Sequence, residues 1–138
     1  MTAPSGSFAL LVDRDLGFLM WLGEVFNELG WQAFPALHCR QALVLAKRSE
    51  FPVTLLVINP GLPGTARAVK ALAGANPGLR VVLIVDSAAD PNPGGVKSRA
   101  ANRMQGRSKL ERPSPWEPIS RQEWVARVQR ALADSRAT

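Results

Sequence analysis

Short continuous apolar runs alternate along the chain with segments in which apolar residues recur every three or four positions. Continuous runs of strand length predict β-strands buried on both faces, and the three-and-four spacing predicts amphipathic helices. Proline at position 35 lacks an N–H for a ladder, so its run predicts an edge strand. The strand-like runs cover 8–13, 31–37, 53–58 and 80–85, and the helical patterns cover 16–29, 40–49, 66–75 and 121–132.

Two of the predicted helices carry recognisable end signals. Asp15 is placed to cap the first helix, and Gly30 is placed to end it. Ser120, with Glu123 three residues later, forms a capping box in front of the last helix.

The alternation weakens after residue 86. Turn-forming residues fill "DSAADPNPGG", and the helical pattern over 96–105 has little apolar surface to bury, so we expect an irregular or weakened fourth helix. Three prolines within "RPSPWEP", residues 112–118, remove ladder donors. That stretch therefore predicts at most a brief fifth strand at the sheet edge.

Repeated strand–helix units predict an α/β fold with a five-stranded parallel sheet and helices on both faces. We expect one domain over residues 8–133, with a flexible N-terminus at 1–7 and a C-terminal tail at 134–138. In such sheets ligands bind beyond the carboxyl ends of the strands. The residues expected at that edge are Asp13 to Asp15, Asn59 to Gly61 and Val85 to Ser87.

Composition agrees with a single domain and limits the cellular compartments in which the protein is expected. The 138 residues are 46% hydrophobic, yet no run of apolar residues is long enough to span a membrane and no secretory signal precedes the first strand. Cys39 is the sole cysteine, which excludes an internal disulfide and a multi-cysteine metal site. We expect a cytoplasmic protein that does not bind membranes.

Positive charge is concentrated in the second half of the chain. Residues 1–79 hold six Lys or Arg and five Asp or Glu, whereas residues 80–138 hold eleven and six. Such an excess attracts nucleic acid or an acidic protein surface, or simply forms a solvated surface. Most of it falls within 97–112, where the basic residues are Lys97, Arg99, Arg103, Arg107, Lys109 and Arg112.

Four segments, in order, resemble the receiver domain of two-component response regulators over roughly residues 8–133. "ALLVDRD" is similar to the family's first strand with its acidic cluster, and "LLVINPGLPG" to the third strand with its phosphoacceptor Asp. "NPGLRVVLIVDSA" is similar to the fourth strand, which ends at Thr or Ser, and "WEPISRQEWVARVQRAL" to the Lys-Pro segment before the final helix. The resemblance implies a flavodoxin-like, doubly wound sheet.

At the matched positions the phosphorylation chemistry of the family is missing. Asp13 is present, but Arg14 stands where the second Mg²⁺-binding acid is expected. Asn59 replaces the phosphoacceptor Asp, and a neutral amide is not a nucleophile. Val85 falls at the hydroxyl position, and Glu117 at the position of the Lys. We expect no conventional phosphotransfer, no metal, no cofactor and no enzymatic activity.

Three alternatives at these positions stay open. Shifting the fourth strand by one residue puts Asp86 at the hydroxyl position, which restores no hydroxyl. Arg14 and Glu117 reverse the family's charges, so they either form an internal ion pair or are exposed and unrelated. Asp13, Asp15 and Asp86 are the acids that a hard cation would need, with Arg14 among them as an opposing charge.

These residues predict a pseudo-receiver, a signalling module that binds a protein partner without being phosphorylated. The partner, or a second copy of the chain, is expected at the face formed by the fourth helix, fifth strand and final helix. The alternative is a nucleic-acid-associated regulatory protein that uses the segment 97–112. The candidate partner-binding residues are Lys97, Arg99, Arg103, Arg107, Lys109, Arg112 and Trp116.

Overall fold

Strands and helices alternate along the chain in the computed structural model, which describes residues 8–48, 52–86, 108–114 and 117–135. Their positions are close to those predicted for the first four strands and for the helices on either side of them. In chain order the elements are β1 (Phe8–Val12), α1 (Leu16–Glu28), β2 (Gln32–Ala36), α2 (Cys39–Arg48), β3 (Val53–Ile58), α3 (Thr65–Ala75), β4 (Arg80–Asp86), β5 (Ser108–Arg112) and α5 (Arg121–Asp134).

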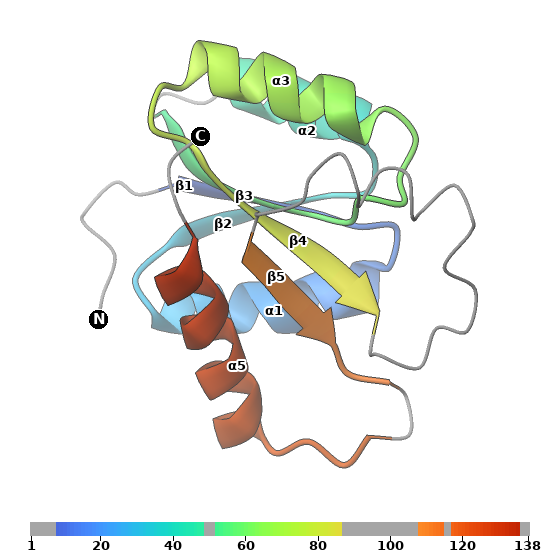
Figure 1. The fold of residues 1–138 in the computed structure, drawn as a ribbon, viewed down its shortest axis with the longest axis vertical. Coiled ribbons are helices and arrows are strands. Elements are labelled where there is room, and N and C mark those ends of the chain that lie inside the picture. Colours follow the sequence, from blue (N-terminus) through green and yellow to red (C-terminus); the bar gives the residue numbers. More distant parts are fainter. Residues whose placement is uncertain (1–7, 49–51, 87–107, 115–116, 136–138) are drawn as a thin grey trace.

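The five strands form one parallel sheet in the order β2-β1-β3-β4-β5. Helices α1 and α5 cover one face, and α2 and α3 cover the other (Figure 1). This is the expected flavodoxin-like, doubly wound architecture. The prediction that Pro35 marks an edge strand is confirmed, because β2 pairs only with β1 and forms one end of the sheet.

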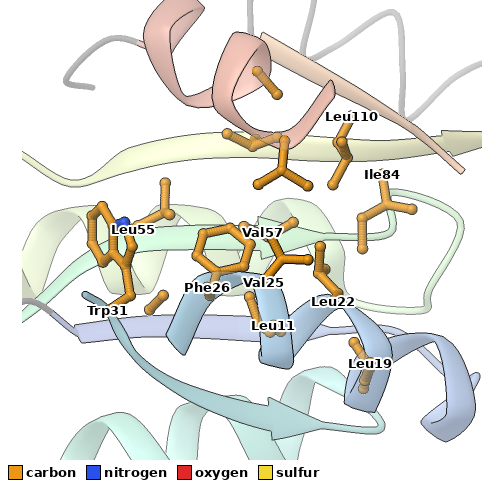
Figure 2. Close-up of a cluster of buried hydrophobic side chains, with 14 of the residues drawn as sticks. Leu11, Leu19, Leu22, Val25, Phe26, Trp31, Leu55, Val57, Ile84 and Leu110 are labelled. Atoms are coloured by element: carbon orange, nitrogen blue, oxygen red, sulfur yellow. The ribbon is translucent and has the colours of Figure 1, made fainter. Parts of the chain in front are cut away.

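Alternate residues of the central strands feed two separate hydrophobic cores. One core lies between the sheet and α1/α5, where strand residues such as Leu11 and Val57 meet Leu22 and Phe26 of α1 (Figure 2). The other lies between the sheet and α2/α3 and begins with Leu10 and its neighbours. Burial on both faces explains why these strands read as continuous apolar runs.

The predicted helix ends have the expected local hydrogen bonds. The Asp15 side chain accepts from the backbone N–H of Phe18, 3.1 Å away, at the start of α1. Gly30 follows the end of that helix with a φ of 92°, a left-handed conformation that glycine adopts without strain. The Ser120 hydroxyl accepts from the backbone N–H of Glu123 at the start of α5, which confirms this half of the capping box.

The position predicted for the fifth strand is wrong. β5 comprises Ser108–Arg112, within the basic segment, rather than residues 112–118. Its central Leu110 is buried beneath α1 and α5, and its backbone pairs in parallel with β4. Pro113 has no N–H, so the ladder ends where the expected strand was to begin.

The expected flexible N-terminus at 1–7 and the expected weakened fourth helix over 96–105 lie outside the described residues. Within the described part of the chain, no helix is both long enough and apolar enough to cross a bilayer.

Candidate functional site

Four polar side chains meet at the carboxyl edge of the sheet because of the alternation along its strands. Each comes two residues after a strand residue that belongs to the α1/α5 core, so all four side chains lie on that face of the sheet. Backbone hydrogen bonds from Asp13 to Ala36 and from Asn59 to Val12 extend the ladders to this level. The four residues are Asp13, Asn59, Asp86 and Arg112.

Asp13 is the centre of the site and is fully buried. Its Oδ1 accepts from the backbone N–H of Asp15 at 3.0 Å. Its Oδ2 accepts from Asn59 Nδ2 at 3.5 Å and from the Arg112 guanidinium, with which it forms an ion pair. A buried carboxylate is costly unless it is paired and hydrogen-bonded, and here both oxygens have partners from within the chain.

Arg112 extends from the end of β5 into a cage of acidic and aromatic groups. Beyond Asp13, its Nη1 lies 3.8 Å from Asp15 Oδ2 and its Nε lies 3.5 Å from Asp86 Oδ1. Its guanidinium carbon lies 4.6 Å from the centroid of the Phe18 ring, in cation–π geometry. The side chain is only 20% exposed. An internal cation therefore occupies the space among the three carboxylates.

The Asn59 side chain is held in one orientation by two hydrogen bonds. Its Oδ1 accepts from the backbone N–H of Gly61 at 2.8 Å, which leaves its Nδ2 pointing at Asp13. The Thr65 hydroxyl lies 3.2 Å from the Asn59 carbonyl oxygen and 2.8 Å from that of Leu62, and ties the loop to the start of α3. A neutral donor at position 59 satisfies Asp13, whereas a second carboxylate would repel it.

Of the two alternatives for Arg14 and Glu117, the internal ion pair is not formed. Arg14 is exposed and makes no ion pair with any described residue. Glu117 lies beyond the end of β5, where its carboxylate pairs with Arg127 of α5 at 3.2 Å. Arg127 also donates to the Glu111 carbonyl, so it connects α5 both to β5 and to Glu117.

Val85 does not lie at the site, but Asp86 does. Alternation turns Val85 to the opposite face of the sheet, where it packs against the α2/α3 core. Asp86 takes the position at the carboxyl end of β4, and its side chain is 56% exposed. The register shifted by one residue is therefore the one that the fold adopts, and it brings a carboxylate rather than a hydroxyl to this edge.

The match of Glu117 to the Lys of the family is also wrong. The basic residue at the end of the fifth strand is Arg112, and Pro113 follows it, as in the Lys-Pro motif of the resemblance. This signal was visible in the sequence five residues before Glu117-Pro118. It was missed because the strand was expected to begin at Arg112 instead of ending there.

The candidate partner-binding residues fall into three groups according to where the structure places them. Arg112 is held inside the site and is not a free surface cation. Lys109 is exposed and, together with Arg127 and Arg130, lines an open pocket of about 230 Å³ between β5 and α5. The others lie outside the described residues: Lys97, Arg99, Arg103, Arg107 and Trp116.

Cys39 and Thr65 form a second polar contact, on the α2/α3 side of the sheet. Burial raises the pKa of the Cys39 thiol, although a hydrogen bond with Thr65 lowers it in part. The Cys39 sulfur lies 3.9 Å from the Thr65 hydroxyl oxygen, at the junction of α2 and α3. Among the described residues, no group of three or more His, Cys, Asp or Glu is arranged to hold a metal ion.

Several solved structures that share this fold are receiver domains. The receiver domain protein of Clostridium thermocellum superposes with a TM-score of 0.60 at 12% identity, over 92% of this chain and 94% of that one. The chain has the fold of a response-regulator receiver domain. The receiver domain of an HD domain-containing protein of Pseudomonas fluorescens gives a TM-score of 0.63 at 20% identity, over 96% and 91% of the two chains.

A third receiver, the chemotaxis response regulator CheY4 of Vibrio cholerae, gives a TM-score of 0.58 at 16% identity, over 91% of this chain and 98% of that one. No family model matches the chain, and no curated protein matches it in sequence. Apart from the resemblance of four short segments, the receiver fold is therefore supported by the three-dimensional comparison.

Proposed function

We propose that the chain is a receiver-like signalling module that binds protein partners without being phosphorylated and has no enzymatic activity. The supporting observation is the closed network around Asp13. This buried carboxylate is neutralised by Arg112 and hydrogen-bonded by Asn59 and by the backbone of Asp15. The site thus reaches a satisfied state with groups from its own chain.

The main chemical reason for proposing that the chain is not phosphorylated is the missing nucleophile. A receiver of the kind described above transfers a phosphoryl group to a carboxylate, and the Asn59 amide at that position cannot accept it in the same way. A positive charge is not missing, because Arg112 supplies it. The proposal therefore rests on Asn59 and on Asp13, the carboxylate to which the Asn59 amide donates. It does not rest on the negative charge of Glu117, which pairs with Arg127.

Phosphoryl donors test the proposal directly. The chain is incubated with acetyl phosphate and Mg²⁺ and its intact mass is measured. In parallel, thermal unfolding is followed with and without beryllofluoride and Mg²⁺. We expect no added mass and no shift in Tm. A phosphoryl adduct, or a rise in Tm with beryllofluoride, would contradict phosphorylation independence.

The Asn59→Asp variant shows whether the amide is the group that the site requires. A second carboxylate beside Asp13 should lower the free energy of unfolding by roughly 1–3 kcal/mol, because the buried Asp13 carboxylate loses a hydrogen-bond donor and like charges face each other. Asn27→Asp, on the exposed side of α1, is the matched control and should lower stability by only about 0.3 kcal/mol, the cost of an exposed anion in the last turn of a helix. Equal effects for the two variants would show that Asn59 has no special role.

The interaction part of the proposal predicts binding that ignores phosphorylation conditions. A protein that binds the purified chain should do so with the same Kd before and after treatment with acetyl phosphate. A Kd that changes with this treatment would contradict the proposal.

A further inference from the structure

The helices on the α2/α3 side of the sheet carry only positive charge. Three Lys or Arg lie on α2 and two on α3, and neither helix contains Asp or Glu. All five are exposed, and the two helices pack against each other. We call this surface the α2/α3 basic face; its cations are Arg40, Lys47, Arg48, Arg67 and Lys70.

No ion pair within the described part of the chain accounts for these cations. None of the five forms an ion pair with any residue in the described ranges. Lys47 and Arg48 lie in the last turn of α2, where the helix dipole favours a cation. Arg40 and Arg67 lie in the first turns of α2 and α3, where the same dipole disfavours one.

Arg121 provides the internal comparison. It also lies in the first turn of its helix, α5, but it pairs there with Glu24 and Glu28 of α1. The cost of a cation at that helix end is thus offset across the interface. Arg40 and Arg67 lack any such partner among the described residues, so their placement opposes local stability, as expected of groups retained for binding.

An apolar side chain lies within the basic face. Val44 is 40% exposed and follows Arg40 by one turn of α2, with Lys47 and Arg48 one turn later. Leu37, just before α2, is 38% exposed. Phosphates of a nucleic acid make no use of aliphatic groups, and the other large apolar residues of both helices pack fully or partly against the α2/α3 core, so the helices present too little large apolar surface to insert into a lipid bilayer.

We propose that the α2/α3 basic face docks an acidic segment of a partner protein, with carboxylates on its cations and an apolar side chain over Val44. The proposal rests on the proposed function as an interaction module, but it does not depend on the state of the Asp13 site. It also places the contact on the face opposite α5, away from the fifth strand and final helix.

Binding of two labelled probes tests this surface. The probes are a short peptide with Glu and Leu at helical spacing and a short DNA duplex, each measured by fluorescence anisotropy across a salt series. We expect the peptide to bind the unaltered chain. The double variant Arg67→Glu/Lys70→Glu should weaken peptide binding about tenfold, because attraction becomes repulsion at two positions.

The matched control is Lys109→Glu/Arg130→Glu, which changes the net charge equally but at the pocket between β5 and α5. It should weaken peptide binding less than about threefold. Val44→Ser should weaken the peptide about threefold through lost apolar contact and leave the duplex unchanged. Circular dichroism of each variant verifies that the fold is retained.

Four results would overturn the proposal. They are no peptide binding by the unaltered chain, equal losses in the two double variants, a loss confined to the Lys109/Arg130 variant, and tighter binding of the duplex with the same dependence on Arg67 and Lys70. The last result would assign the face to nucleic acid. A phosphoryl adduct would contradict the proposed function but would not contradict docking at the α2/α3 basic face. The two proposals can therefore be disproved independently.

Discussion

Helices α1 and α5 on one face of the sheet carry four acidic and three basic side chains, whereas α2 and α3 on the other face carry five basic and no acidic ones. The first pair joins its charges across the interface through Arg121, Glu24 and Glu28. The second pair leaves its charges exposed. The two layers share one sheet and similar apolar cores, yet among the described residues only the first forms ion pairs between its helices.

This difference separates side chains that are engaged within the chain from side chains that are exposed on its surface. Beneath α1 and α5, the Trp124 ring is fully buried and stacks on Trp21 at 4.4 Å between centroids. The Phe18 ring packs in a tilted orientation against Trp124 and also contacts Arg112. Phe18 therefore links this aromatic group to the carboxyl-edge site. The α1/α5 layer is therefore expected to be sensitive to substitution, and the surface of the α2/α3 layer to be tolerant.

The largest expected effect is at Trp124. Trp124→Ala should lower the free energy of unfolding by roughly 3–5 kcal/mol, because a large buried ring is removed. Its Nε1 has no hydrogen-bond partner among the described residues, so Trp124→Phe should cost clearly less. Val44→Ala on α2 is the control and should stay within about 0.5 kcal/mol. Urea denaturation measures all three; similar losses at Trp124 and Val44 would break the contrast.

The next effect is expected at the link between the aromatic group and the site. Arg112→Met should cost roughly 2–4 kcal/mol, because it leaves the buried Asp13 carboxylate without its counter-charge. Adding Asp13→Asn should recover part of that loss. Lys109→Met is the matched control on the exposed side of β5 and should change little. If Arg112→Met and Lys109→Met unfold at the same urea concentration, Arg112 does not hold the site together.

A smaller effect is expected for the ion pair between α1 and α5. A double-mutant cycle with Arg121→Gln and Glu28→Gln should give a coupling of about 0.2–1 kcal/mol, the range for exposed pairs. The coupling should shrink at high salt, because both side chains are about half exposed. A coupling of zero at low salt would show that the charges of this layer are no more engaged than those of α2 and α3.

The smallest effect should have the opposite sign. Arg67→Gln removes from the first turn of α3 a cation that has no ion-pair partner among the described residues, and it should raise the free energy of unfolding by about 0.3 kcal/mol. Thermal unfolding at low salt measures the change, with Lys70→Gln, one turn further along, as the comparison. A loss of stability in Arg67→Gln would mean that Arg67 has a structural partner, which would weaken its assignment to a binding face.

Most of the fold could be predicted because its strongest signals are local. The runs around Leu11, Val57 and Ile84 are buried on both faces, so their apolar character shows in the sequence without knowledge of their neighbours. The caps at Asp15 and Ser120 depend on residues at most three positions away. These signals were sufficient for the doubly wound sheet and for its edge at Pro35.

The fifth strand and the site could not be predicted as well, because they depend on long-range pairing. In β5 a single buried residue, Leu110, lies between polar neighbours, so the strand has no apolar run, and it is recognised by its pairing with β4. Once its register is known, alternation along the strands selects Asp86 over Val85 and Arg112 over Glu117. A one-residue change of register moves a side chain to the opposite face of the sheet.

The sequence by itself determined the α/β class, most of the helices and strands, and the presence of an amide at position 59. Those properties follow from periodicity and from residue identity, which are local. Only the tertiary structure decided that Arg112 is the cation that neutralises Asp13, and that the helix charges of the first half lie on opposite faces of the sheet, the acidic ones on α1 and the basic ones on α2 and α3. Summed over residues 1–79 all charges nearly cancel, and those of the helices separate because the winding of the fold places α1 and α2 on opposite faces of the sheet.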